Sequence, residues 1–480
     1  MLRPETKPEP EPDPTVFAWF LRAAEQGNPY AQFNLALLYK NGEGVRRDDG
    51  LACLWLARAA RQHLAFAQNH LGSMYSQGRG VPRSDSLAAY WFGLAAEQGD
   101  ASAQQNLGDL YRKGRGVPRQ ADQAVSWYYK AAEQDLPSAQ RLLGECYLNG
   151  EGVAINHALA LAWFRKAAVL EDAAAEVELG LMARRGQGTA AAGRGEHGGH
   201  DGEAEALHWF RRAAGRGHPA AQRLLGLACL DGVAGCDPQG AYTWLQCAAR
   251  QGDAEAQFSL GQMLAGGGQG KQAGHCDDVR ALAWTTRAAE QGHVLAQYNL
   301  GNMYAHGRGV PRDPARALHW YRLAAEQGSP NAQFTLGVMY AHGQGVRRDE
   351  TAAVAWYRRA AEQGDASAQN NLGVMYANGQ GVRQDDAQAV HWYGMAAEQG
   401  HALAQYNLGG MYNSGRGVER DTVRSYMWML LAADAGDAAA SANKAIVARR
   451  LSPQQIDSAV DMQRAWRRAR RVESAERRAA

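Results

Sequence analysis

Residues 365–400 read DASAQNNLGVMYANGQGVRQDDAQAVHWYGMAAEQG, and near-copies of this stretch follow one another along most of the 480-residue chain. Its last five residues, Ala-Ala-Glu-Gln-Gly, also begin at Ala23, Ala95, Ala288, Ala324 and Ala360. The last four starts, including Ala396, are 36 residues apart. With Asp365 as position 1, eleven full repeats lie between residues 28 and 436, after a half repeat at 17–27. The chain is therefore analysed as a repeat array.

Each repeat carries two short segments with helical spacing. The apolar residues of both segments recur at i, i+4, i+7 and i+8, which places them on one face of a helix. They are Ala368, Leu372, Met375 and Tyr376 in the first segment, and Ala389, Trp392, Tyr393 and Ala396 in the second. Helices of ~12 residues are marginal alone, so neighbouring repeats must bury their apolar faces. The sequence predicts an all-α solenoid of about eleven 36-residue helix-turn-helix repeats.

The Gly-x-Gly at Gly379 and Gly381 has two interpretations. Glycines allow backbone N–H groups to approach an anion, so the loop could hold a phosphate. The same Gly-x-Gly occurs ten times, and ten phosphate sites in one chain are not credible. We therefore interpret the glycines as a turn with positive φ after the first helix, with Asp385 as the N-cap of the second helix.

Tryptophan is used once per repeat. Twelve of the 13 tryptophans occupy position 28, as Trp392 does. A large apolar residue at one fixed place in every layer predicts core filling between layers.

The 36-residue pattern of Ala-Gln, Leu-Gly, Met-Tyr, Gly-x-Gly-Val, Trp-Tyr and Ala-Ala-Glu-Gln-Gly resembles the Sel-one-like repeat, a relative of the tetratricopeptide repeat. The resemblance covers residues 17–436 and implies a right-handed α/α superhelix whose first helices line the concave side. Residues 451–466, LSPQQIDSAVDMQRAW, are similar to the helical end of such proteins. We expect residues 437–480 to form capping helices and a basic tail. We expect residues 1–16, which are rich in proline and acidic residues, to be a disordered tail.

Composition narrows the function classes. Fifty-one Lys and Arg against 49 Asp and Glu give a net charge of +2 without a long block of one sign, which disfavours nucleic acid as a partner. No apolar run reaches the ~18 residues of a membrane span. The six cysteines have irregular spacing, which disfavours a disulfide framework. We expect a cytoplasmic protein, or a periplasmic or secreted one if the true start lies upstream; the sequence does not predict the oligomeric state.

Catalytic and cofactor signatures fail in this sequence. Gly266–Gln272, GGGQGKQ, departs from a phosphate-binding loop, because Ala265 stands in place of its first glycine and Gln272 in place of its Ser or Thr. Cysteine-rich relatives, for which penicillin binding or hydrolysis has been suggested, carry cysteines where this chain has Ala397 and Gln405. We expect no enzyme and no cofactor. A hydrolase or metal-dependent protein is the disfavoured alternative.

Two glycine-rich insertions contain residues that could bind a metal ion. They are His197, His200, Asp201, His275 and Cys276. Imidazole, carboxylate and thiolate are zinc ligands, but solvated loops explain the composition better. We therefore predict no metal site.

The first helix has a second face that the core does not use. If positions 4, 8, 11 and 12 are core, positions 6, 10 and 13 lie opposite. The residues of this face differ from repeat to repeat, as expected where each repeat contacts a different part of a partner. The asparagines at position 7 flank this face. The candidate partner-binding residues are Gln105, Asn106, Arg112, Arg141, Tyr298, Asn299, Asn302, Phe334, Asn370, Asn371, Tyr406 and Asn407.

Each group of these candidates has an alternative role. The asparagines could hold a peptide backbone, as the resemblance implies, or tie neighbouring helices together. The aromatic residues could anchor apolar side chains of a partner or pack between first helices. Gln105, Arg112 and Arg141, with Lys113, could form a basic subsite for an acidic peptide.

The leading functional prediction is a non-enzymatic scaffold that binds protein or peptide partners on the concave face. The alternative is a periplasmic or secreted envelope or virulence factor with the same fold. Residues 172–292 contain the three repeats that depart from 36 residues, and position 12 there is Ala183, Cys229 and Leu264 where eight repeats have Tyr. We expect these degenerate repeats to be the weakest part of the solenoid.

Overall fold

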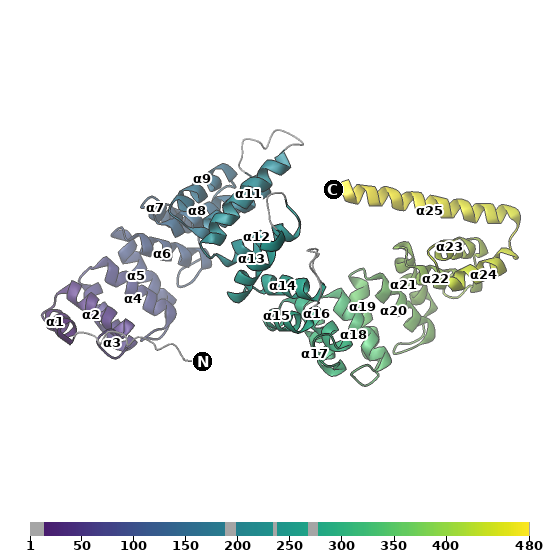
Figure 1. Ribbon diagram of the computed structural model, residues 1–480, viewed down its shortest axis with the longest axis horizontal. Helices are drawn as coiled ribbons and strands as arrows, with labels where there is room; N and C mark the ends of the chain where they lie inside the picture. The colour runs from purple at the N-terminus through teal and green to yellow at the C-terminus, as the bar shows by residue number, and fades with distance from the viewer. Residues whose placement is uncertain (1–13, 188–197, 234–237, 267–276, 480) are drawn as a thin grey trace. The chain divides into compact units, whose positions relative to one another are not determined.

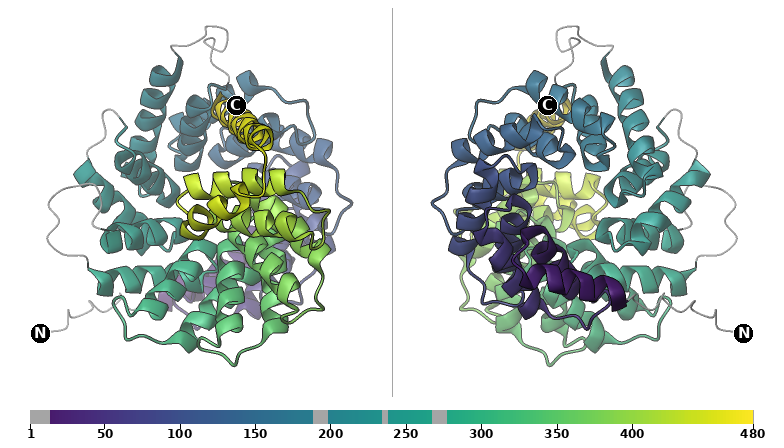
Figure 2. Two further views of the ribbon diagram at one scale, coloured as in Figure 1. Left: turned by 90° about the vertical axis from the view of Figure 1, so that its right-hand side faces the viewer. Right: turned by 90° about the vertical axis from the view of Figure 1, so that its left-hand side faces the viewer.

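A computed structural model describes residues 14–187, 198–233, 238–266 and 277–479 (Figure 1). These residues form 25 helices, and no strand occurs among them. The chain divides into two compact units, Met1–Cys247 and Ala248–Ala480. Within each unit, successive second helices lie beside the first helix of their own repeat and that of the next (Figures 1 and 2). The predicted all-α solenoid is confirmed.

The helices alternate along the chain. The half repeat supplies α1 (Pro14–Glu25). The first helices are α2 (Pro29–Asn41), α4 (Ala65–Gln77), α6 (Ala101–Lys113), α8 (Pro137–Asn149), α10 (Ala173–Arg184), α12 (Pro219–Leu230), α14 (Ala254–Gly266), α16 (Val294–His306), α18 (Pro330–His342), α20 (Ala366–Asn378) and α22 (Ala402–Ser414). The second helices are α3 (Asp49–Arg61), α5 (Asp85–Glu97), α7 (Ala121–Ala132), α9 (His157–Val169), α11 (Gly198–Gly215), α13 (Pro238–Arg250), α15 (Asp278–Glu290), α17 (Pro314–Glu326), α19 (Glu350–Glu362), α21 (Asp386–Glu398) and α23 (Thr422–Asp434). The chain continues with α24 (Ala438–Ala448) and α25 (Pro453–Ala479).

The Gly-x-Gly loop is a turn, as predicted. Gly379 ends α20 in the left-handed conformation, with φ 68°, and its N–H donates to the carbonyl of Met375. Asp385 begins α21 by accepting a hydrogen bond from the N–H of Gln388 at 3.0 Å. The second glycine has a different reason: a Cβ at Gly381 would lie 2.2 Å from the carbonyl oxygen of Glu350 in the preceding repeat. Its absence lets the loop pack directly on the start of α19.

The centre of each layer is a large side chain packed on a glycine. Tyr393 at position 29 is only 4 % exposed. A Cβ at Gly373 would come within 2.6 Å of its ring, which explains the recurring Leu-Gly of the first helix. The ring therefore occupies the volume that a side chain at Gly373 would need.

The prediction that tryptophan fills the core of every layer holds only in part. Trp55, Trp163 and Trp428 are buried, whereas most of the other tryptophans at position 28 are half-buried. Trp392 is half-buried and packs against the layer of the preceding repeat, around Tyr357. Trp19 is 64 % exposed, because no described residue precedes α1 to cover it. Position 29 is therefore the main core residue, and position 28 packs at the joint between repeats, where three of its tryptophans are buried.

Paired glutamines join the repeats. Gln369 donates through its amide to the carbonyl of Ala361 in the preceding repeat at 3.0 Å. It also accepts a hydrogen bond from Gln399, of the Ala-Ala-Glu-Gln-Gly segment, at 2.7 Å. In one repeat the pair is replaced by charges: Glu176 is fully buried and lies 3.5 Å from Arg216. The second glutamine gives the buried amide a partner for its acceptor as well as its donor, whereas the Oε1 atoms of Gln140 and Gln405, in repeats without it, have none among the described residues.

The degenerate repeats differ from the rest in several respects. The boundary between the two compact units, at Cys247 and Ala248, falls within them. Cys229 is disulfide-bonded, which the sequence did not predict, whereas Cys53, Cys146 and Cys247 are free.

The last helix covers the second helices at the end of the array. Ala459, Met462 and Trp466 of α25 pack into the layer that contains Trp428. The Trp466 indole donates to Glu398 at 2.8 Å, and Arg467 pairs with Asp434 at 2.6 Å. The described residues contain no helix that is both long and apolar enough to cross a bilayer.

Candidate functional site

Pockets recur at one fixed place in the repeat, where the first helices of neighbouring repeats meet. Three lie in the unit Ala248–Ala480: about 500 Å³ between α16 and α18, about 320 Å³ between α18 and α20, and about 590 Å³ from α20 to α24. A fourth, of about 120 Å³, lies between α4 and α6 in the other unit. Position 29 of one repeat forms part of each wall, together with positions 7 and 11 of the next. We call these cavities the joint pockets.

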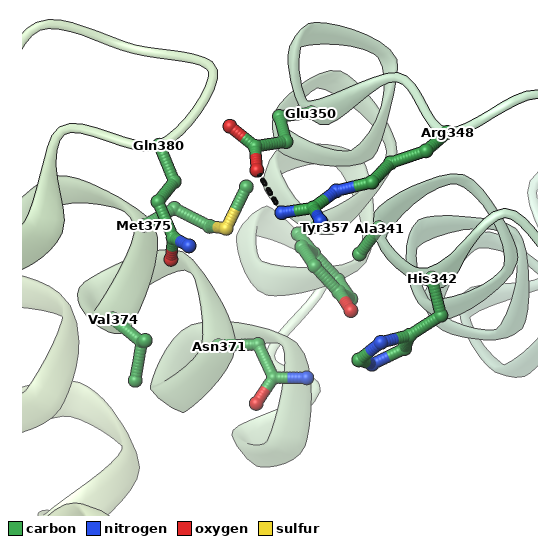
Figure 3. A pocket seen from close by; sticks show the side chains of 9 residues that line it. All are labelled: Ala341, His342, Arg348, Glu350, Tyr357, Asn371, Val374, Met375 and Gln380. Atoms are coloured by element: carbon green, nitrogen blue, oxygen red, sulfur yellow. Dashed lines mark hydrogen bonds and ion pairs between the residues drawn. The ribbon is translucent and has the colours of Figure 1, made fainter.

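The joint pocket between α18 and α20 shows the typical arrangement (Figure 3). The Tyr357 hydroxyl, the Asn371 amide and the His342 ring point toward one another across it. Val374 and Met375 supply an apolar wall, and Gln380 approaches from the loop of the next repeat. A pocket with an apolar wall and a few convergent polar groups suits a side chain of a partner.

Tyrosine hydroxyls lie deep in the joint pockets. Burial raises the pKa of Tyr321 and of Tyr357, and raises that of Tyr393 to about 12. The Tyr321 hydroxyl donates to Asn302 Oδ1 at 2.7 Å. At neutral pH these tyrosines are uncharged hydrogen-bonding groups, which suits binding and gives no activated nucleophile or base.

Ion pairs cross several joints beside the pockets. An acid at the start of a second helix pairs with an arginine at position 16 of the next repeat. These pairs are Asp49 with Arg79 at 3.0 Å, Asp85 with Arg115 at 2.6 Å, Asp278 with Arg308 at 3.1 Å and Asp386 with Arg416 at 2.6 Å.

Two joints of the second compact unit, Ala248–Ala480, depart from this pattern. Between α18 and α20, position 16 is Gln380, and Glu350 pairs instead with Arg348 of its own loop. Between α16 and α18, Pro314 replaces the acid and Gln344 the arginine. These two joints hold pockets of about 320 and 500 Å³, and within the part of the chain that the structure describes no inter-repeat ion pair bridges them.

The predicted aromatic residues at position 6 contact neighbouring side chains. The Tyr298 ring lies 5.6 Å from Tyr321, and the Phe334 ring lies 5.9 Å from Tyr357. Tyr406 lines a joint pocket, and its hydroxyl accepts from Asn443 of α24 at 2.8 Å. Tyr298, Phe334 and Tyr406 are all half-buried, so each also leaves part of its surface open.

The predicted asparagines divide into two groups. Asn302, Asn371 and Asn407 line joint pockets of the second compact unit, and Asn106 lines that of the first. Asn370 is 2 % exposed, and its Oδ1 accepts from Asn407 at 3.0 Å.

Asn106 also makes a contact outside its pocket, and Asn299 completes the set of predicted asparagines. Asn106 donates to Asn69 of the preceding repeat at 3.0 Å, so the tie between helices exists beside the pocket lining. Asn299 is half-buried on α16.

The predicted basic subsite is neutralised from within. Arg112 pairs with Glu151 at 2.8 Å and lies 3.5 Å from Glu145. Arg141 pairs with Glu145 and lies 3.6 Å from Asp172. The third member, Gln105, accepts from Ser138 of the next repeat. These arginines already have carboxylate partners, which offset their attraction for an acidic peptide.

Sequence reasoning missed the residues that shape the pockets. The apolar spacing predicts packing for Tyr393 and, by repetition, for Tyr321 and Tyr357, and the predicted binding residues do not include Arg312 and Gln344. The sequence does carry one signal for these pockets. At the α16 to α18 joint, Pro314 and Gln344 stand where other joints have an acid and an arginine.

The metal prediction can be followed only in part. His200 and Asp201 fall within α11, whereas His197, His275 and Cys276 lie outside the described residues. Among the described residues, no group of three His, Cys, Asp or Glu could hold a metal ion.

Comparison with protein families identifies the repeat. The Sel1 repeat matches residues 17–28, 29–64, 65–100, 101–136, 137–170, 173–218, 219–253, 254–293, 294–329, 330–365, 366–401 and 402–437. The chain belongs to the Sel1 repeat family. Sel1 repeats generally mediate protein–protein interaction and are generally non-catalytic.

Solved structures include similar Sel1 repeat arrays. A protective antigen present in uropathogenic Escherichia coli strains is 34 % identical, with a TM-score of 0.67 and 94 % of each chain covered. A Sel1 repeat protein from Oxalobacter formigenes is 26 % identical over 92 % of this chain and 96 % of that chain, with a TM-score of 0.35. No curated protein sequence matches the chain.

Proposed function

We propose that this Sel1 repeat protein is a non-catalytic scaffold that binds an extended segment of a protein partner along the joint pockets of its second compact unit. The repetition of one pocket at three successive joints, from α16 to α24, supports the proposal. Neighbouring pockets lie one repeat apart, so an extended chain could place side chains in several of them. Binding in several pockets gives specificity that a single pocket could not.

The pocket walls suit a peptide. Asn371, Asn407 and Gln380 each offer an amide, which has both a donor and an acceptor for a peptide group. Val374 and Met411 add apolar surface for side chains. Of the predicted binding residues, this proposal retains the pocket-lining ones and leaves a structural role for Asn370.

The test is to fill the pockets from half-buried positions of their walls. Thr335→Trp and Val374→Trp place a large ring in two neighbouring joint pockets, where both residues are half-buried. Ala355→Trp, on the exposed side of α19, is the matched control. A displayed library of random 12-residue peptides is selected on the wild-type chain, and the enriched peptides are measured on each variant.

We expect the enriched peptides to lose at least tenfold in affinity on the two pocket variants and to bind the Ala355→Trp protein as they bind the wild type. Equal binding to all three variants, with unchanged thermal melts, would place the partner elsewhere. Substituting Tyr298, Phe334 and Tyr406 together by Ala separates contact from packing. If the triple variant loses peptide binding but unfolds at the same temperature as the wild type, the three rings contact the partner. If its unfolding temperature falls sharply, the three rings pack between helices.

A further inference from the structure

We propose that the joint pocket between α16 and α18 binds a carboxylate side chain of an acidic partner segment, whereas the next pocket, between α18 and α20, is neutral. The inference rests on the proposed function and adds the chemical class of the partner. It follows from the charges around two pockets that are otherwise built alike.

The first observation is that the first helices that line the three joint pockets from α16 to α22 lack acids. The helices α16, α18, α20 and α22 contain no Asp or Glu among their residues. Earlier first helices do carry them, as Asp109 in α6 and Glu145 in α8 show. A peptide that lies along α16 to α22 therefore meets no carboxylate on these helices, which lowers the repulsion that an acidic segment would experience.

The second observation is an arginine without a partner. Arg312 lines the α16 to α18 pocket, and among the described residues no hydrogen bond or ion pair of its side chain is found. In corresponding loops the arginine at this position pairs with the acid two residues later, as Arg47 does with Asp49 at 3.0 Å. Here that later residue is Pro314. The guanidinium keeps a fixed charge and five N–H donors for an external group.

The other lining residues fit the same ligand. The pocket of about 500 Å³ is lined by Asn302, Ala305, His306, Arg312, Pro314, Tyr321, Thr335, Met339 and Gln344, with no carboxylate among them. The amide of Gln344 and the ring of His306 can each donate a hydrogen bond. An arginine with two neutral donors is a suitable set for a carboxylate, because charge-assisted hydrogen bonds are the strong ones.

The α18 to α20 pocket is a natural contrast. His342, Arg348 and Gln380 occupy the places of His306, Arg312 and Gln344. Here Glu350 stands where the first pocket has Pro314, and it pairs with Arg348 (Figure 3). One acid thus neutralises the second pocket. The repeat itself shows that a glutamate at this helix position is compatible with the fold.

The test uses this natural substitution on the full-length chain. Pro314→Glu should neutralise the first pocket, and Pro314→Gln is the uncharged control. Glu350→Gln should free Arg348 and create a second carboxylate site. The probes are two labelled peptides of 12 residues, (Ala-Glu-Pro)₄ and (Ala-Gln-Pro)₄, and a 12-nucleotide single-stranded DNA that offers phosphate instead. Binding is followed by fluorescence anisotropy at 20 mM and 500 mM NaCl.

We expect the wild-type chain to bind the Glu peptide at least tenfold more tightly than the Gln peptide and the oligonucleotide in 20 mM NaCl. The preference should fall at high salt, because ions screen the attraction. Pro314→Glu should remove the preference, Pro314→Gln should keep it, and Glu350→Gln should increase it by several-fold.

Three results would overturn the inference: equal or undetectable binding of the two peptides, tighter binding of the oligonucleotide, or no effect of Pro314→Glu. Peptides enriched from the random library that occupy the pockets without a preference for Glu would leave the proposed function standing. If the library peptides also fail to bind at the pockets, both the inference and the proposed function are wrong.

Discussion

At the scale of single residues, the repeat depends on one close contact between a glycine and an aromatic ring. The contact pairs Gly373 with Tyr393, and a Cβ at Gly373 would sit 2.6 Å from the ring. Neither residue type alone predicts this pairing, because the two are 20 positions apart on different helices. The sequence shows only that both positions repeat.

Gly373→Ala should therefore destabilise the protein although alanine is the better helix former. Overpacking of this kind costs ~1–3 kcal/mol. Gly394→Ala on α21 is the matched control, since its Cβ would meet no atom within 4 Å. We expect it to stabilise by up to ~1 kcal/mol through helix propensity. Urea unfolding of both variants gives the comparison, and equal effects would contradict the packing described.

Tyr393 and Trp392 should differ in the same assay. Tyr393 is 4 % exposed, so Tyr393→Ala should cost ~3–5 kcal/mol through lost burial and a cavity. Trp392 is half-buried at the joint, and Trp392→Ala should cost less, ~1.5–3 kcal/mol. A larger loss for the tryptophan variant would restore tryptophan as the core residue.

At the scale of elements, several joints between hairpins combine apolar packing with one exposed ion pair. The α20 to α22 joint has the pair of Asp386 with Arg416, and the two joints before it do not. The sequence shows the missing acid at Pro314 and the missing arginine at Gln344. Only the tertiary structure shows the result, a pocket that no ion pair among the described residues bridges, because the loop and the next repeat meet there.

The Asp386 pair should make stability depend on pH. Hydrogen bonding to Arg416 holds the pKa of the Asp386 carboxyl below its usual value. A lowered pKa means that this stabilisation is present above the unfolded pKa of ~3.9 and is lost as the pH falls through the folded pKa. Asp386→Asn should therefore cost ~0.5 kcal/mol at pH 7, a typical value for an exposed pair. The difference from wild type should vanish near pH 2, as measured by urea unfolding, with the exposed Glu419→Gln as control.

The cap helix α25 should depend on one tryptophan. Trp466 packs 6.3 Å from Trp428 and donates to Glu398, so Trp466→Ala should cost ~1.5–3 kcal/mol of the stability of the last repeats. Arg468→Ala, an exposed neighbour, should have no measurable effect. Hydrogen exchange of α23 in both variants is the measurement. Unchanged protection in Trp466→Ala would show that α25 does not cap the array.

At the scale of the whole molecule, the degenerate repeats should be the least stable part. Position 12 in residues 172–292 is Ala183, Cys229 and Leu264 instead of tyrosine, so fewer large side chains bridge the layers. In a repeat array, the free energy of unfolding is approximately the sum of the stability of each repeat and of its interfaces with its two neighbours. Distant repeats therefore do not stabilise a weakly packed segment. We expect amide hydrogens in residues 172–292 to exchange faster than those in residues 300–400. Equal protection in the two segments would contradict this.

The sequence by itself determined the helical hairpin, its period and the number of layers, because apolar spacing, capping aspartates and turn glycines act within a few residues of each other. Only the tertiary structure showed that position 29 fills the core, that Asn370 is buried and that Arg112 and Arg141 already have carboxylate partners. It also placed the pockets at the joints. These facts depend on contacts between residues about 20 to 40 positions apart, and a single sequence carries no direct record of which distant residues meet.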